Sequence, residues 1–177
     1  MKKIKLIKGK GILFWVTGLS GSGKTSIAKL LKKDIEKLYG KTVVLSGDDL
    51  RKCFNLFKFD KKSRFENGQK FIKLCKILTN QKINVILAIV GMDKNLRKLN
   101  KTKFKNYVEI YIKSDLGKIK KIGKKKIYQN FKTDIVGLDI KPELPKEAHI
   151  KINNDFKYSI EVLKNKILKK MNRFEYK

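Results

Sequence analysis

The sequence predicts an α/β three-layer sandwich built on a mostly parallel, five-stranded sheet. Five short apolar runs are bounded by Gly, Asn or Asp, and segments with helical periodicity alternate with them along the chain. This alternation is typical of right-handed crossovers, with ligands bound at the carboxyl ends of the strands. A length of 177 residues suits one domain with one core, so we expect a single domain over residues 1–177.

The elements follow in chain order from these patterns. The expected strands are Ile12–Thr17, Thr42–Leu45, Asn84–Val90, Tyr107–Ile112 and His149–Ile152. The expected helices are Lys24–Leu38, Ser63–Asn80 and Phe156–Met171. Gly137, Pro142 and Pro145 interrupt a stretch that is too long for a plain connection, which predicts a lid-like segment over about residues 118–147.

Charge and cysteine content restrict the partners and the compartment. The net charge is +29, from 45 Lys and Arg against 16 Asp and Glu, but the lysines are scattered and no nucleic-acid-binding motif organises them. We therefore expect a basic surface that attracts anionic nucleotides rather than a nucleic-acid partner.

No apolar run approaches the roughly 20 residues that span a bilayer, so no membrane partner is expected. Two cysteines without a disulfide framework indicate a reducing, cytoplasmic location.

A phosphate-binding loop is the strongest local signal. The segment Gly18–Thr25 matches G-x-x-x-x-G-K-[ST] and lies between an apolar strand and a helix, as in P-loop NTPases. We expect Lys24 to reach the β- and γ-phosphates of ATP and Thr25 to ligate Mg2+. The expected ATP-binding residues are Gly18, Leu19, Ser20, Gly21, Ser22, Gly23, Lys24, Thr25 and Ser26.

The rest of the chain narrows the class of P-loop protein. A GTPase requires a base-reading N-K-x-D element, and the sequence has none. The strand expected at Asn84–Val90 runs into Gly91 and Met92 rather than ending in the aspartate of many P-loop ATPases. Together with the short length of the chain, these features favour a small kinase of the nucleotide-kinase kind.

Two carboxylates and a guanidinium follow the second strand, at Asp48, Asp49 and Arg51. A carboxylate can orient or deprotonate an attacking hydroxyl, and an arginine can clamp an acceptor phosphate. The simpler alternative is that the aspartates only cap the next helix. We expect Asp48 and Lys24 to be the catalytic pair.

The chain resembles the adenylylsulfate kinase family, which transfers the γ-phosphate of ATP to the ribose 3′-hydroxyl of adenosine 5′-phosphosulfate. Residues 8–28 are similar to its W-x-T-G-L-S-G-S-G-K start, and Asp48 and Arg51 fall on its D-G-D-N-x-R segment. Residues 55–67 keep the spacing of its N-x-x-x-G-F and D-R-x-E-N elements. The resemblance implies that the acceptor is bound by Asp48, Arg51, Asn55, Phe59, Arg64, Asn67 and, from the lid, Lys125.

Departures from the family pattern gather on the acceptor side. The I-S-P-Y turn of the family appears as residues 90–93, Val-Gly-Met-Asp, and Ser46 replaces the first aspartate of D-G-D-N. Ile135 stands where the family has an aromatic residue that sandwiches the acceptor adenine. A relative with another acceptor is therefore the alternative hypothesis, such as the cytidine diphosphoramidate kinase of capsule phosphoramidate biosynthesis.

Two other functions remain open from the sequence. A nucleic-acid-binding P-loop ATPase would account for both the charge and the loop, and it would show polynucleotide stimulation that weakens steeply with salt. A nucleotide-binding regulator without turnover would not need Lys24, Thr25, Asp48 and Arg51 together. A homodimer is the default oligomeric expectation, because C2 is the commonest closed symmetry.

Overall fold

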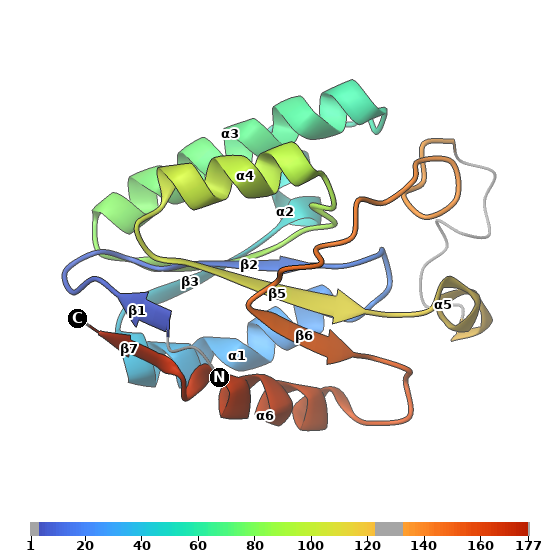
Figure 1. The fold of residues 1–177 in the computed structure, drawn as a ribbon. Helices are drawn as coiled ribbons and strands as arrows, with labels where there is room; N and C mark the ends of the chain where they lie inside the picture. The colour runs from blue at the N-terminus through green and yellow to red at the C-terminus, as the bar shows by residue number, and fades with distance from the viewer. Residues whose placement is uncertain (1–3, 123–132, 177) are drawn as a thin grey trace.

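A computed structural model of the chain describes residues 4–122 and 133–176. Its central sheet has five parallel strands in the order β3-β4-β2-β5-β6 (Figure 1). Their bounds are β2 Leu13–Thr17, β3 Thr42–Ser46, β4 Asn84–Ala88, β5 Tyr107–Lys113 and β6 Ile150–Asn153. The predicted strands are thus confirmed, with boundary shifts of one or two residues.

Helices cover both faces of the sheet, as a three-layer sandwich requires. Helices α1 (Lys24–Tyr39) and α6 (Ile160–Met171) lie on one face, and α3 (Lys61–Asn80) and α4 (Lys94–Lys103) lie on the other (Figure 1). Successive side chains of a strand point to opposite faces. Phe14 and Val16 accordingly pack in the layer of α1 and α6, whereas Leu13 and Trp15 pack in the layer of α3.

Several short elements escaped the sequence analysis. Helix α4 carries few apolar residues among its lysines, and α2 (Gly47–Cys53) and α5 (Leu116–Ile122) have seven residues each, too short for a clear helical period. Strands β1 (Ile4–Leu6) and β7 (Phe174–Tyr176) pair in parallel as a separate two-stranded sheet that joins the two ends of the chain. Three-residue strands leave no period to detect.

The carboxyl ends of the strands gather the segments expected to bind ligands. Figure 1 shows α5 and the orange segment that begins at residue 133 beyond the arrowheads of β5 and β2. The expected lid-like segment therefore lies on this side where it is described, and its residues 123–132 lie outside the described part of the chain. In the described ranges, no helix is long and apolar enough to cross a bilayer.

The buried Asn84 fastens the chain entering β2 to the start of β4. Its Oδ1 accepts a hydrogen bond from the Ile12 amide at 3.0 Å, and its Nδ2 donates to the carbonyls of Tyr39 and Gly40 at 3.0 and 3.1 Å. Asn84 is 1% exposed, so water cannot replace these partners. One side chain thus aligns β2, and with it the loop that follows, against its neighbours.

We predict that Asn84→Ala lowers the free energy of unfolding by about 2 kcal/mol, because a buried amide and two carbonyls lose their partner. Chemical denaturation would measure this. The matched control Asn80→Ala removes an exposed asparagine and should change stability by less than about 0.5 kcal/mol. Equal effects of the two substitutions would contradict the anchoring role.

Candidate active site

The glycine-rich loop joins the end of β2 at Thr17 to the start of α1 at Lys24. Gly23 precedes the helix in the left-handed conformation at φ 88°, and no side chain caps the helix. Only glycine fits at position 18, because a Cβ there would lie 2.5 Å from the Ile112 carbonyl oxygen. An uncapped helix N-terminus behind a glycine loop is a fitting cradle for phosphate.

Lys24 and Thr25 lie where this cradle would need them. The Lys24 ammonium donates to the Leu19 carbonyl oxygen at 2.6 Å, so the side chain folds back across the loop. Thr25, the second residue of α1, is half-buried, and its hydroxyl is an oxygen donor of the kind that Mg2+ prefers. The Ser22 hydroxyl is buried without a hydrogen-bond partner in the described part of the chain, as expected where a ligand completes the site.

Asn154 supports the loop from the far end of the chain, and the sequence analysis missed it. This residue follows β6, is 2% exposed, and donates from Nδ2 to the Ser22 carbonyl at 3.1 Å. Its own amide is fixed by a hydrogen bond to the Lys113 carbonyl at 2.8 Å. Its place directly after the last strand, at the edge where ligands bind, was the available signal.

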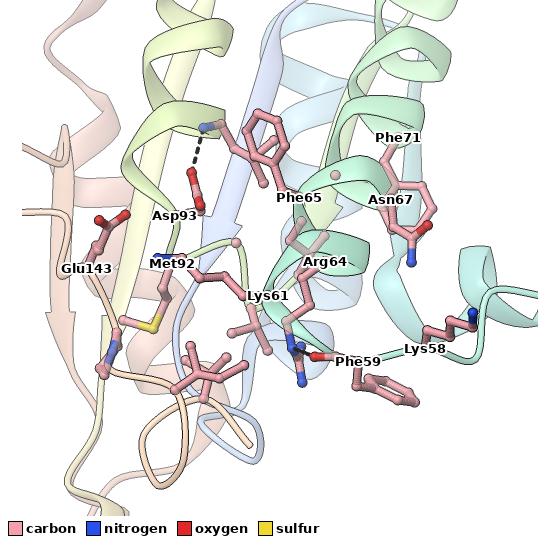
Figure 2. Close-up of a pocket in the computed structure, with 18 of the residues that line it drawn as sticks. Lys58, Phe59, Lys61, Arg64, Phe65, Asn67, Phe71, Met92, Asp93 and Glu143 are labelled. Atoms are coloured by element: carbon pink, nitrogen blue, oxygen red, sulfur yellow. Dashed lines mark hydrogen bonds between the residues drawn. The ribbon is translucent and has the colours of Figure 1, made fainter. Parts of the chain in front are cut away.

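A cavity of about 470 Å³ opens beside the loop, between α2, α3, the segment after β4 and the segment 136–143. Four predicted acceptor-binding residues line it: Arg51, Phe59, Arg64 and Asn67 (Figure 2). Its volume lies within the range of small-molecule sites. We call this cavity the acceptor pocket.

Two guanidinium groups lie close to the Phe59 ring at one side of the acceptor pocket. The guanidinium carbons of Arg51 and Arg64 are 5.4 and 5.3 Å from the centre of its ring, which is cation–π distance. Arg64 also donates from Nε to the Phe59 carbonyl and from Nη2 to the Asp134 carbonyl, the latter at 2.8 Å. Arg64 therefore ties the Phe59 loop to the segment that closes the pocket.

The start of α3 holds this loop in place. Asp60 caps the helix by accepting from the Ser63 amide at 2.9 Å and from the Ser63 hydroxyl at 2.6 Å. These hydrogen bonds, the one from the hydroxyl first, stabilise the carboxylate and lower the pKa of Asp60.

The two adjacent aspartates of α2 have different roles. Asp48 forms an ion pair with Arg51 one turn on, and 56% of its side chain is exposed. Asp49 accepts from the Ser46 hydroxyl at 2.7 Å, while the Ser46 side chain accepts from the Asp49 amide at 3.2 Å. Ser46, and neither aspartate, is thus the N-cap residue of α2, with Asp49 bound to its hydroxyl. Asp48 faces outward beside Arg51.

Four residues named from the sequence are not among those that line the acceptor pocket, and the exposed Asp48 is the first of them. Asn55 is exposed after α2, in the left-handed conformation at φ 52°, and does not line the cavity. Lys125 lies outside the described residues. Ile135 is 5% exposed, and its amide donates a hydrogen bond to Asp139 Oδ2. The neighbouring Val136 and Ile140 line the pocket, and Ile135 does not.

The sequence analysis placed residues 90–93 on the acceptor side, but it did not foresee that they pair with Glu143 to form the far side of the acceptor pocket. Met92, Asp93 and Glu143 line it, opposite Lys58, Phe59 and Arg64 (Figure 2). The Glu143 amide donates to the Met92 carbonyl at 3.0 Å, and the Glu143 carboxylate accepts from the Lys94 amide at 2.6 Å. Residues 50 positions apart are thus locked together, a pairing that no local pattern could indicate.

The phosphate loop and the acceptor pocket share a wall at Val90. Its carbonyl oxygen accepts from the Thr17 hydroxyl and from the Gly18 amide, the latter at 3.5 Å, while Val90 itself lines the pocket. A small apolar cluster also joins Leu19 of the loop to Met92 and Val136 of the pocket. Two ligands, one on the loop and one in the pocket, would therefore lie next to each other.

Comparison with known proteins adds the following findings. Residues 10–153 match the profile of the adenylylsulphate kinase family. A cytidine diphosphoramidate kinase of Campylobacter jejuni is 32% identical, over 93% of this chain and 99% of its own. An adenylyl-sulfate kinase of Clostridium kluyveri is also 32% identical, over 93% and 85%. The fold is shared with the Mycobacterium tuberculosis APS kinase solved with AMPPNP and APS, at a TM-score of 0.81, 24% identity and coverage of 92% and 98%.

We predict that Asn154→Ala weakens Mg-ATP binding about tenfold, because the Ser22 carbonyl loses its donor and the phosphate loop loses its brace. Titration calorimetry with a non-hydrolysable ATP analogue would measure the change. Asn153→Ala, an exposed asparagine one position earlier, is the matched control and should bind like the unaltered protein. Unchanged affinity in Asn154→Ala would exclude the bracing role.

Proposed function

Because the chain belongs to the adenylylsulphate kinase family, a family of phosphotransferases, we propose that it transfers the γ-phosphate of ATP to a ribose hydroxyl of a small nucleotide. The observation that carries this proposal is the wall shared at Val90, since direct transfer requires donor and acceptor sites in contact. The unit that acts is the single domain of residues 1–177, with residues 118–147 as its lid-like segment.

On the donor side, the amides of the phosphate loop and the N-terminus of α1 bind the β-phosphate of ATP. Lys24 exchanges its hydrogen bond to Leu19 for the β- and γ-phosphate oxygens and stabilises the charge that develops there. The Thr25 hydroxyl would hold Mg2+. The metal would supply positive charge across the transferring phosphoryl group.

On the acceptor side, Asp48 orients the attacking hydroxyl and takes up its proton. Arg51 holds the Asp48 carboxylate through their ion pair and reaches the acceptor phosphate. Arg64 and Asn67 bind the phosphate and the sugar, and Phe59 stacks on the base. In this proposal Arg51 and Arg64 already lie against the Phe59 ring before the acceptor enters, so little ordering is needed on binding.

Adenosine 5′-phosphosulfate is the first acceptor to consider, and its product would be 3′-phosphoadenosine 5′-phosphosulfate. The match to the adenylylsulphate kinase profile over residues 10–153 supports it. So does the positively charged side of the pocket, formed by Arg51, Lys58, Lys61 and Arg64.

A cytidine diphosphoramidate is the second candidate, and two observations favour it. The Campylobacter jejuni kinase named for that compound matches along 99% of its own length. In addition, the pocket wall near residue 135 is made by the aliphatic Val136 and Ile140. Aliphatic side chains offer no ring for stacking on the large face of adenine.

The proposal predicts that Mg-ATP yields ADP at a rate that depends on a small nucleotide acceptor. A coupled ADP-release assay would compare adenosine 5′-phosphosulfate, cytidine diphosphoramidate and unmodified nucleotides. We expect Lys24→Ala to lower turnover about 100-fold or more, because loop cations act mainly on the transition state. The exposed Lys29→Ala on the same helix is its control.

Turnover of Lys24→Ala within tenfold of the unaltered enzyme would contradict the donor-side scheme. ADP release that responds to DNA or RNA, with a steep loss at higher salt, would instead support a nucleic-acid-dependent ATPase.

A further inference from the structure

The acceptor pocket has two sides of opposite charge. Its α2 and α3 side carries Arg51, Lys58, Lys61 and Arg64, whereas Asp93 and Glu143 line the other side together with the exposed Lys141. In Figure 2, Asp93 and Glu143 lie on the side of the pocket opposite Lys58, Phe59 and Arg64. A pocket shaped only for a polyanion would not carry two carboxylates.

Asp93 has one carboxylate oxygen available to a ligand. Its Oδ1 caps α4, accepting from the amides of Asn95 and Leu96 at 2.7 and 3.1 Å. Within residues 4–122 and 133–176, no hydrogen bond is made to Oδ2, and the residue is half-buried at the pocket wall. The cap fixes the carboxylate in one orientation, so Oδ2 is a preset hydrogen-bond acceptor.

Glu143 strengthens the negative character of this side without competing for the ligand. Its Oε2 accepts from the Lys94 amide at 2.6 Å, and its Oε1 lies 3.9 Å from the Lys94 ammonium. The amides at the N-terminus of α4 are therefore already bound by Asp93 and Glu143. A further anion placed beside Asp93 would meet repulsion.

The backbone of residues 90–93 shapes this side so that Asp93 faces the cavity. Gly91 has φ 49°, and a Cβ there would lie 2.8 Å from the Trp15 ring carbon Cζ2. The chain thus passes directly over the Trp15 ring, and Met92 and Asp93 follow into the wall. The Glu143 amide holds the Met92 carbonyl in this path.

The orientation of the acceptor rests on the proposed function. If the base lies on Phe59 and the phosphate at Arg64 and Asn67, the opposite side of the pocket, at Met92 and Asp93, is where a group attached beyond that phosphate would lie. The cavity of about 470 Å³ has room for this extension. The terminal group would then lie beside Asp93 Oδ2, on a side that also carries Glu143 and the exposed Lys141.

We infer that Asp93 determines specificity by accepting a hydrogen bond from an N–H group at the end of the acceptor's phosphate chain. The acceptor class is a nucleotide whose terminal phosphorus carries an amine. A terminal sulfate has oxygens only, so it cannot donate to Oδ2 and is repelled by Asp93 and Glu143.

The variant Asp93→Asn separates this role from the structural one. Asparagine caps helices as well as aspartate does, so α4 and the melting temperature should be preserved. The substitution replaces the accepting Oδ2 by a donating amide and removes one negative charge. Glu147→Gln, on an exposed carboxylate that contacts Lys101 outside the pocket, is the matched control.

The experiment measures binding and ADP release for cytidine diphosphoramidate, cytidine diphosphate and adenosine 5′-phosphosulfate. We expect the unaltered protein to bind the amidate at least about tenfold tighter than the diphosphate, which differs from it only at the terminal group. In Asp93→Asn the amidate should lose about tenfold in affinity while the phosphosulfate gains, and Glu147→Gln should change neither.

The inference would be overturned if Asp93→Asn changed the affinity for all three ligands in parallel, or if it left the ratio of amidate affinity to diphosphate affinity unchanged. Failure of the unaltered protein to bind the amidate would also overturn it. The proposed function fails separately, if no acceptor stimulates ADP release. A shifted binding ratio without turnover would uphold the role of Asp93 and reject the kinase activity.

Discussion

The hydrogen bonds that Thr17 and Gly18 donate to the Val90 carbonyl are the junction on which both halves of the site depend. They join the ends of two neighbouring parallel strands, one leading into the phosphate loop and one into the wall of the acceptor pocket. Asn84 sets the same two strands in register at their opposite end. The sheet therefore fixes the spacing of donor and acceptor before either ligand binds, which is the preorganisation that phosphoryl transfer requires.

Positive and negative side chains lie in different parts of this site, and we assign them different roles in binding nucleotides. Lys24 and the N-terminus of α1 concentrate positive charge on the donor side, and Arg51 and Arg64 extend it across the ring of Phe59. The basic surface of the whole chain favours the approach of any nucleotide. Asp93 and Glu143 interrupt this field at one side of the pocket, where selection among nucleotides becomes possible.

Sequence reasoning succeeded where the signal was local. The five strands were recognisable as short apolar runs, and the phosphate loop as a motif with the right neighbours. Arg51, Phe59, Arg64 and Asn67 were named from the family resemblance, and they line one cavity. The alternative that the aspartates cap the helix was wrong, because Ser46 is the N-cap and Asp49 accepts a hydrogen bond from the Ser46 hydroxyl.

Sequence reasoning failed where distant segments meet. Asn154 binds a loop 132 positions earlier, and Glu143 binds residues 92–94. The residues that flank Asn154 and Glu143 in the sequence therefore give no sign of either contact. Helix α4 was missed because its ten residues carry only two apolar side chains, Leu96 and Leu99. Ile135 is buried with its amide bound to Asp139, and Val136 and Ile140 line the pocket near it.

The central claim is that the γ-phosphate reaches a ribose hydroxyl of a nucleotide lying beside Asp48. Phosphorus NMR of the purified reaction product tests it most directly. The account predicts a new phosphate monoester coupled to a ribose proton, with the terminal group of the acceptor unchanged. Free phosphate as the sole product, or a phosphate added to the terminal group, would contradict it.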